Sequence, residues 1–296
     1  MFNIKCLFTI AYVVSCMGLM AQNQYKGQVI SKQANQPVPF AFVTDEHRKW
    51  GTSTDENGYF VLDERPVGDT LIVGCLGFFE YKIPFSQWKN PMKIFLSEKP
   101  FQLQEVIIEN NRKKHTLWLG SQIKTTTRSV GQISFPTVQE IAVLIPNYLQ
   151  SEGYIHKVGY WISRLGKHKT PFRVRIYKNQ NGMPGEDLLQ ENLIVHARRG
   201  DGWFDIDVSK YNIPIPNEGF FISMEWIYST NPKYSYEVTW PNKKVITHFG
   251  QNIGRAVEFN ENLSRIRNNG GQWRIYNADM QPVINPMIRV QIQIYE

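Results

Sequence analysis

"GTSTDENGYFVL" (51–62) has the spacing of a calcium-binding loop and also that of a tight turn between two strands. Positions 1, 3, 5, 6 and 12 of an EF-hand register are occupied by Ser53, Asp55, Asn57, Gly58 and Glu64. An EF-hand loop lies between two helices and begins with an acid, whereas strand-type sequence flanks this stretch and Ser53 stands first. Asn57-Gly58 tolerates positive φ, so the stretch predicts a β-hairpin and no metal site, with Asp55 accepting hydrogen bonds from turn amides.

Short apolar runs separated by Gly, Pro, Asn and Asp continue the pattern on both sides of this turn. The runs are "KGQVI" (26–30), "PFAFV" (39–43), "YFVL" (59–62), "DTLIVGCL" (69–76) and "MKIFL" (92–96). Such spacing is typical of a small antiparallel sandwich. Cys75 alternates with Leu71 and Val73, so we expect a buried, small apolar residue there rather than a catalytic thiol.

Several motifs of this region occur in the order expected of one known family. They are "GQV" (27–29), "QPVPFAFV" (36–43), "GTSTDENGYFVL" (51–62), "DTLIVGCLGF" (69–78) and "LQEVII" (103–108). Together they resemble the carboxypeptidase-like regulatory domain, a transthyretin-like sandwich found on exported proteins of Gram-negative envelopes. The resemblance implies a non-catalytic appendage. In agreement, none of the six His residues has the spacing of a zinc site.

The rest of the chain also alternates between apolar and polar residues. "FRVRIY" (172–177), "WFDIDV" (203–208) and "IRVQIQIY" (288–295) each predict a strand with one apolar face. In the first of them the pattern places Val174 on one face and Arg173 on the other. "TVQEIAVLIP" (137–146) is compatible with a helix or a strand, and its β-branched content favours a strand.

Two longer stretches of this second region, 173–189 and 202–226, resemble accessory jelly-roll or carbohydrate-binding-like sandwiches of exported bacterial proteins. No binding residues come with that resemblance. The predicted fold is all-β, with a small transthyretin/Ig-like N-terminal sandwich and a larger jelly-roll-like C-terminal sandwich. The expected division is a signal peptide (1–21), the regulatory domain (22–108), a linker (109–130) and the accessory domain (131–296).

The N-terminus has the layout of an export signal. Lys5 precedes an apolar stretch of about 16 residues that ends at Ala21 and is followed by polar sequence. This stretch is short for a membrane helix, and no other stretch is long and apolar enough to span a bilayer. We therefore expect cleavage after Ala21 and no transmembrane segment in the mature chain. In the alternative, "VVSC" (13–16) is a lipoprotein box and Cys16 is lipidated.

Charge and aromatic content narrow the possible partners. The net charge of +7 is spread thinly, without the concentrated basic stripe of a nucleic-acid binder, so we expect ordinary solvated surface and no nucleic-acid partner. Trp203 and Trp240 have polar or turn residues beside them and are the candidate ligand-binding residues, because an exposed indole stacks on a sugar ring. The competing interpretation is that these rings are buried between the sheets.

No catalytic motif stands out. The chain lacks a Gly-x-Ser-x-Gly elbow and a phosphate loop, and we interpret the Arg-Gly-Asp at 199–201 as a chance match. The acid pairs Asp205/Asp207 and Glu186/Asp187 leave open a hydrolase, since glycosidases use two carboxylates. The main expectation is a non-enzymatic, cofactor-free exported protein of the cell envelope that serves binding, adhesion or assembly, located in the periplasm, at the outer-membrane surface or secreted. Its partner is an unknown envelope protein or glycan, and glycan binding through the C-terminal sandwich is the alternative.

Overall fold

The computed structural model describes residues 24–63, 65, 68–100, 113–133, 138–150, 152–189, 191–228, 232–239, 243–279 and 281–295. The predicted signal peptide, Cys16, the motif at 103–108 and Trp240 lie outside these ranges. Within them the chain is all-β, as predicted, with two β-sandwich domains and three single 3-10 turns. None of the helices in these ranges has the length and apolar character of a membrane span.

The N-terminal domain is a sandwich of two small sheets. Its strands are β1 (Tyr25–Ser31), β2 (Phe42–Asp45), β3 (Gly51–Ser53), β4 (Tyr59–Leu62), β5 (Thr70–Gly74), β6 (Tyr81–Pro84) and β7 (Met92–Leu96), with the 3-10 turn η1 (Phe85–Gln87). One sheet has the order β4-β1-β7 and the other β3-β2-β5-β6. Between them lies a core that includes Val29, Val43 and Leu71, and Cys75 is buried in it as expected.

The tight turn in the stretch 51–62 forms, but it does not close a hairpin. Asp55 Oδ1 accepts hydrogen bonds from the backbone amides of Asn57 (2.9 Å) and Tyr59 (2.8 Å), and Gly58 has a φ of 73°. The predicted pairing of the flanking strands is wrong, because β3 and β4 belong to different sheets. Thr54 is the reason: its amide and hydroxyl bond to the Ala41 and Val38 carbonyls, which directs the chain from one sheet into the other.

The C-terminal domain is a larger sandwich of two sheets. The seven-stranded sheet contains β10 (Gln139–Ile145), β12 (Phe172–Gln180), β13 (Met183–Asp187), β14 (Ile194–Val195), β16 (Phe220–Trp226), β19 (Ser264–Asn268) and β20 (Arg274–Ile275). The eight-stranded sheet contains β8 (Lys114–Gly120), β9 (Ser129–Ile133), β11 (Gly153–Gly166), β15 (Gly202–Asp207), β17 (Ser235–Thr239), β18 (Val245–Ala256), β21 (Asn285–Pro286) and β22 (Ile288–Tyr295). The 3-10 turns η2 (Ser209–Tyr211) and η3 (Pro232–Tyr234) precede β16 and β17.

The inner faces of these two sheets form one core. Val174 and Ile222 from the seven-stranded sheet and Val158 and Val290 from the eight-stranded sheet are fully buried in it. The strand predictions for 172–177, 203–208 and 288–295 are therefore confirmed, and 137–146 contains the strand β10. Within the stretch 109–130, expected to be a linker, β8 pairs along β22.

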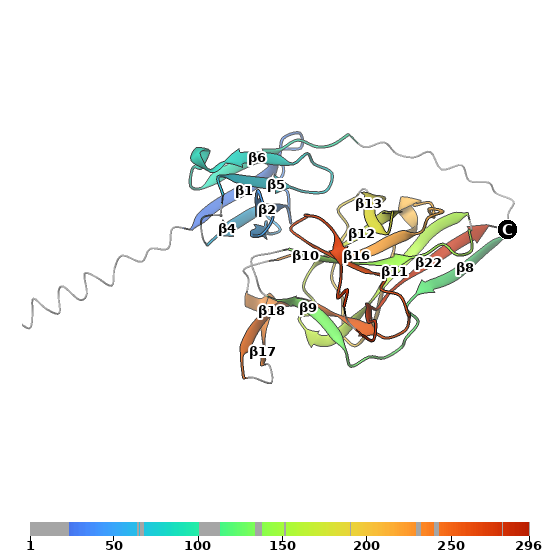
Figure 1. Ribbon diagram of the computed structural model, residues 1–296. Helices are drawn as coiled ribbons and strands as arrows, with labels where there is room; N and C mark the ends of the chain where they lie inside the picture. Colours follow the sequence, from blue (N-terminus) through green and yellow to red (C-terminus); the bar gives the residue numbers. More distant parts are fainter. Residues whose placement is uncertain are drawn as a thin grey trace, which may run out of the picture.

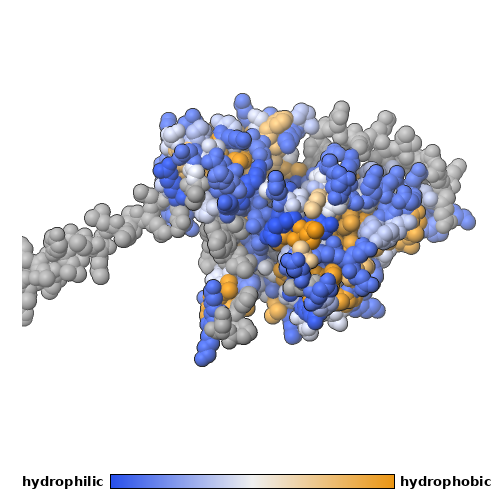
Figure 2. Space-filling model, in the orientation of Figure 1, coloured by the Kyte–Doolittle hydropathy of each residue, from blue (hydrophilic) through white to orange (hydrophobic). Residues whose placement is uncertain are grey.

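The two domains lie side by side, with the N-terminal domain next to β10 and β16 of the seven-stranded sheet (Figure 1). The face shown in Figure 2 is largely hydrophilic, and much of its apolar surface lies over the C-terminal domain. The seven-stranded sheet is thus covered on both faces, by its own partner sheet on one side and by the N-terminal domain on the other. This junction positions the candidate site.

Candidate functional site

A row of four charged residues crosses the outer face of the seven-stranded sheet at the domain junction. Arg173 of β12 lies opposite Glu225 of β16, which lies opposite Glu140 of β10, which in turn lies opposite Arg267 of β19. Arg173 is 1% exposed and Glu225 is 7% exposed. Alternation correctly separated Arg173 from the face of Val174, which lies in the sandwich core, and the N-terminal domain covers the face that carries Arg173.

The row is satisfied by charge-assisted hydrogen bonds. Arg173 Nη1 donates to Glu225 Oε1, and Arg175 donates to both Glu225 Oε2 (3.3 Å) and Asp187 Oδ2 (2.6 Å). Glu140 Oε2 accepts a hydrogen bond from Arg267 Nε at 2.7 Å. Charges buried in this way are tolerated when each one finds an oppositely charged partner and hydrogen bonds.

Glu225 and Asp187, the two carboxyl groups bonded to Arg175, have pKa values displaced in opposite directions. Burial by itself would raise the pKa of Glu225, but the Arg173 and Arg175 guanidinium groups outweigh it and lower that pKa to about 2. For Asp187, burial outweighs the attraction of Arg175 and raises the pKa to about 6. Of these two carboxyl groups, Glu225 is therefore the one held more firmly in its ionised form.

Hydrogen bonds also join the two domains directly. Arg173 Nη2 donates to the Phe40 carbonyl oxygen at 2.6 Å, and Asn192 Nδ2 lies 3.6 Å from Cys75 Sγ. Arg48 and Asn269 exchange two hydrogen bonds, each 2.9 Å long, between a side chain and a backbone carbonyl. These contacts, spread across the junction, hold the two sandwiches in one arrangement.

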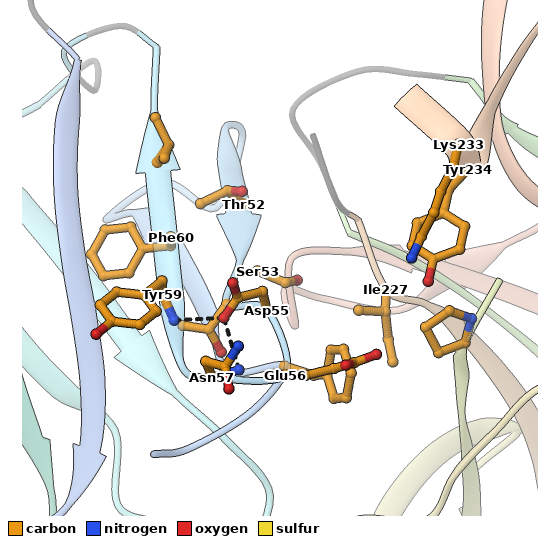
Figure 3. A pocket seen from close by; sticks show the side chains of 14 residues that line it. Thr52, Ser53, Asp55, Glu56, Asn57, Tyr59, Phe60, Ile227, Lys233 and Tyr234 are labelled. Carbon is orange, nitrogen blue, oxygen red and sulfur yellow. Dashed lines mark hydrogen bonds between the residues drawn. The ribbon is translucent and has the colours of Figure 1, made fainter. Parts of the chain in front are cut away.

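A groove of about 510 Å³ opens beside these contacts; we call it the junction groove. Its residues are Phe40, Thr52, Ser53, Thr54, Asp55, Glu56, Asn57, Tyr59, Phe60 and Val61 from the N-terminal domain and Pro171, Ile227, Lys233 and Tyr234 from the C-terminal domain. Figure 3 shows the Asp55 turn on one side of the groove and Ile227, Lys233 and Tyr234 facing it from the other. Clefts between domains, with apolar walls and a few polar groups, are common ligand sites.

The N-terminal wall of the junction groove is made of two strand edges. β3 and β4 are each the last strand of their sheet, and no described strand pairs with their outer sides. The Thr54 amide bonds to Ala41 and the Val29 amide to Gly58. Backbone groups alternate in direction along a strand. The N–H and C=O groups of Ser53 in β3 and of Val61 in β4 therefore point away from the partner strands β2 and β1. Such edges can accept another strand.

The opposite wall carries a positive charge and an aromatic ring. Lys233 Nζ lies 4.5 Å from the centroid of the Tyr234 ring, and both residues belong to η3. Glu56 supplies a carboxylate on the N-terminal side. The groove therefore has opposite charges on its two walls, with Phe40, Tyr59 and Ile227 as apolar surface between them.

Trp203, one of the two residues predicted from sequence to bind a ligand, is not part of the junction groove. Trp203 is on the outer face of the eight-stranded sheet, where its Nε1 donates to the Ile123 carbonyl (3.1 Å) and the Arg289 guanidinium covers its ring at 4.2 Å. Arg289 also bonds to Asp205. Trp203 therefore already has protein partners on its ring and its nitrogen, and Trp240 is outside the described residues.

The acid pairs considered for hydrolysis are engaged in local bonds. Asp207 Oδ1 accepts from the Ser209 amide at 2.9 Å, and Glu186 forms an ion pair with Lys178 at 2.6 Å. Asp205 and Asp187 are bound by arginines, as described above. Among the described residues, no group of three His, Cys, Asp or Glu side chains is arranged to hold a metal ion.

Comparison with known proteins identifies the first domain. Residues 25–108 match the family described as CarboxypepD_reg-like domain, which confirms the resemblance seen in the sequence motifs. No curated protein sequence matches the chain. The family match covers the Asp55 turn and both strand edges of the junction groove, and leaves its C-terminal wall outside.

Two solved structures share a distant likeness. The cysteine protease and lectin-like domains of Cwp84, a surface layer associated protein of Clostridium difficile, are 14% identical with a TM-score of 0.35, over 53% of this chain and 32% of that one. BcpA (D312A), the major pilin subunit of Bacillus cereus, is 9% identical with a TM-score of 0.18, over 78% of this chain and 68% of that one. The chain thus spans about a third of the Cwp84 chain, and neither likeness is close enough to define the fold.

Proposed function

We propose that this protein is a non-enzymatic, exported binding protein of the cell envelope, and that an extended segment of a partner polypeptide binds in the junction groove. The observation that carries the proposal is the pair of unpaired strand edges, β3 and β4, that line one wall of the groove. An extended peptide gains affinity by adding main-chain hydrogen bonds to such an edge and gains specificity from pockets for its side chains.

The fixed junction supports this binding role. Ligand affinity is lost when loops or domains must be ordered on binding, and a pre-formed groove avoids that loss. Here Arg173 bonds to Phe40, a residue of the groove wall, while Arg48 and Asn269 hold the domains together at a second point. Both walls of the groove therefore exist before the ligand arrives.

Two features of the chain support export and the absence of catalysis. The stretch before Gln22 has the order of a cleavable signal, namely a basic residue, an apolar run and a small residue. The CarboxypepD_reg-like domain occurs on exported envelope proteins as an appendage without catalytic residues of its own. The acid pairs considered above for a hydrolase include Asp187, Asp205 and Asp207, which are used in ion pairs and a turn.

The test is to select binding peptides from a displayed random library with the purified protein, then to measure their affinity by calorimetry. The Val61→Pro variant removes the N–H that points into the groove without removing a bond to β1. The matched control is Lys93→Pro on β7, the opposite edge of the same sheet. The Lys32 amide donates to the Leu96 carbonyl, and because backbone groups alternate in direction, the N–H of Lys93 also points away from β1. We expect at least about tenfold weaker binding for Val61→Pro and unchanged binding for Lys93→Pro.

Two results would contradict the proposal. The first is a library that yields no specific peptide. The second is a set of peptides that bind Val61→Pro as tightly as the unaltered protein while both proline variants remain folded by circular dichroism.

A further inference from the structure

A second groove lies in the C-terminal domain and shares no lining residue with the junction groove; we call it the basic groove. Its volume is about 840 Å³. It is formed by the loop that follows β8, by the last residues of β11 and by the end of β18.

Positive charge is concentrated in the basic groove without matching acids. Four cations line it, namely Lys124, Arg128, Arg164 and Arg255, against the single carboxylate of Asp201. No salt bridge within the described residues involves any of the four cations. Like charges gathered in a hollow repel one another, and an anionic ligand relieves that repulsion.

The rest of the lining suits a sugar. Thr125, Thr127 and Ser163 provide hydroxyl groups, which both donate and accept hydrogen bonds. Leu165 and Val257, 53% and 46% exposed, add apolar surface beside the cations. A ring that carries hydroxyl groups, a CH-rich face and a negative charge would complement all three kinds of side chain.

The wall of the basic groove is held in place before any ligand binds. Thr126 Oγ1 donates to the Arg255 carbonyl at 2.7 Å, which ties the loop after β8 to β18. The Ile123 carbonyl accepts the Trp203 indole N–H at 3.1 Å. The Trp203 ring in turn packs edge-on against Trp161, which is 5% exposed, with the centroids 5.8 Å apart.

From these observations we infer that the basic groove binds an acidic oligosaccharide, one whose rings carry carboxylate or sulfate groups. In this role Arg128 and Arg164, both exposed, pair with the acidic groups, and the threonine hydroxyls bond to ring hydroxyls. Trp203 acts as a positioning residue for the loop that contains Ile123. This site is independent of the junction groove and of the peptide proposed to bind there.

Nucleic acid fits the basic groove less well. Single-stranded nucleic acid is bound by cations together with aromatic rings on which successive bases stack. Trp161 is the one aromatic residue of the described lining, and it is almost fully buried. The groove therefore offers charge and hydroxyl groups but no stacking surface.

The experiment is isothermal titration calorimetry of the full chain with two acidic probes, an oligogalacturonate and a heparin oligosaccharide, which separate carboxylate from sulfate recognition. A neutral dextran oligomer and a short DNA duplex serve as comparison ligands. We expect at least one acidic probe to bind, and its Kd to rise with added NaCl because salt screens the charges. The double variant Arg128→Gln/Arg164→Gln should weaken this binding about tenfold or more.

The matched control is Lys82→Gln/Lys93→Gln, which makes the same charge change at exposed positions of the N-terminal domain and should leave the Kd unchanged. All variants replace exposed side chains, and a melting curve verifies that they fold. The inference is overturned if neither acidic probe binds, if dextran or DNA binds as tightly as the acidic probes, or if the two double variants weaken binding equally.

Discussion

Arg173 of the C-terminal sandwich donates a hydrogen bond from Nη2 to the backbone carbonyl of Phe40 in the N-terminal sandwich, with a donor–acceptor distance of 2.6 Å. Phe40 has a φ of 57°, a left-handed conformation that is costly for a bulky residue and persists only where surrounding contacts hold it. The same arginine is bonded to Glu225, so one side chain joins the buried charge row to the wall of the junction groove. Stability of the junction and shape of the groove are thereby coupled.

Replacing Arg173 with methionine should strongly destabilise the protein. The change leaves Glu225 buried with one fewer cation, and breaking one half of a buried ion pair costs about 3–5 kcal/mol of unfolding free energy. Urea denaturation followed by tryptophan fluorescence measures this loss. The matched control is Lys178→Met on the same strand, whose ion pair with Glu186 is exposed and should contribute less than about 1 kcal/mol. If the two variants lose the same unfolding free energy, the buried row contributes no more to stability than an exposed ion pair, which would contradict this prediction.

Stability should fall in acid as Glu225 takes up a proton. Its pKa is lowered from 4.5 to about 2 in the folded protein, so its contribution is fully present above pH 4.5 and is lost as the pH falls toward 2. The displacement corresponds to about 3 kcal/mol of unfolding free energy. The Glu225→Gln variant should lose this part of the pH dependence. A variant whose unfolding free energy falls as steeply below pH 4.5 as that of the unaltered protein would contradict the assignment.

Asp187 should change the pH dependence of stability in the opposite direction to Glu225, and at higher pH. Burial raises its pKa from 3.8 to about 6, so the folded state binds its proton first and is favoured as the pH falls from about 6 toward 4. Asp187→Asn should remove this gain while leaving the loss below pH 4.5 unchanged. Thermal melts between pH 7 and 4 measure this gain in stability. If the melting temperature of the unaltered protein falls steadily as the pH is lowered across that range, and Asp187→Asn does not change the fall, the raised pKa of Asp187 is contradicted.

Asp55 should stabilise the turn without a metal ion. Alanine at this position removes the acceptor of the Asn57 and Tyr59 amides, at a cost of about 0.5–1.5 kcal/mol for each of these exposed hydrogen bonds. Asp69→Ala, which removes an exposed acid paired only with Arg65, is the control and should have little effect. Calcium should not change the melting temperature of the unaltered protein. A rise of several degrees on adding calcium would restore the metal-site interpretation of 51–62.

Cys75 should be unreactive until the protein unfolds. Burial raises the pKa of its thiol, and the thiolate is the reactive form. Ellman's reagent should therefore react slowly with the native protein and quickly in denaturant. The Asn192→Ala variant removes a side chain packed on this sulfur at the junction and should increase the native rate. A fast native reaction in the unaltered protein would show that the junction opens readily.

The mature protein should begin at Gln22. Mass spectrometry of protein purified from the cells that express it tests this expectation, because signal cleavage after Ala21 exposes Gln22 whereas the alternative leaves a lipidated Cys16. Protein that retains Met1 would contradict export altogether.

Sequence alone determined the fold class, because the signals for it are local. Alternation with a period of two and turns built on Gly, Pro and Asn specify strands and their apolar faces within a few residues, as at Val174 and Val290. The Asp55 turn was predictable for the same reason. Its neighbouring strands were not, since pairing of β3 and β4 is decided by the bonds of Thr54 to Ala41 and Val38.

Only the tertiary structure decided where the candidate sites lie. Arg173 and Glu225 carried a signal in the sequence, as charges within otherwise apolar strands, but their burial depends on a second domain whose contacts are distant in the chain. The same is true of both grooves: the Asp55 turn meets Ile227, and Lys124 meets Arg164 and Arg255, across separations that no local pattern encodes. The stretch 51–62 thus identifies its domain from sequence, while its place as one wall of the junction groove follows from packing against the C-terminal sandwich.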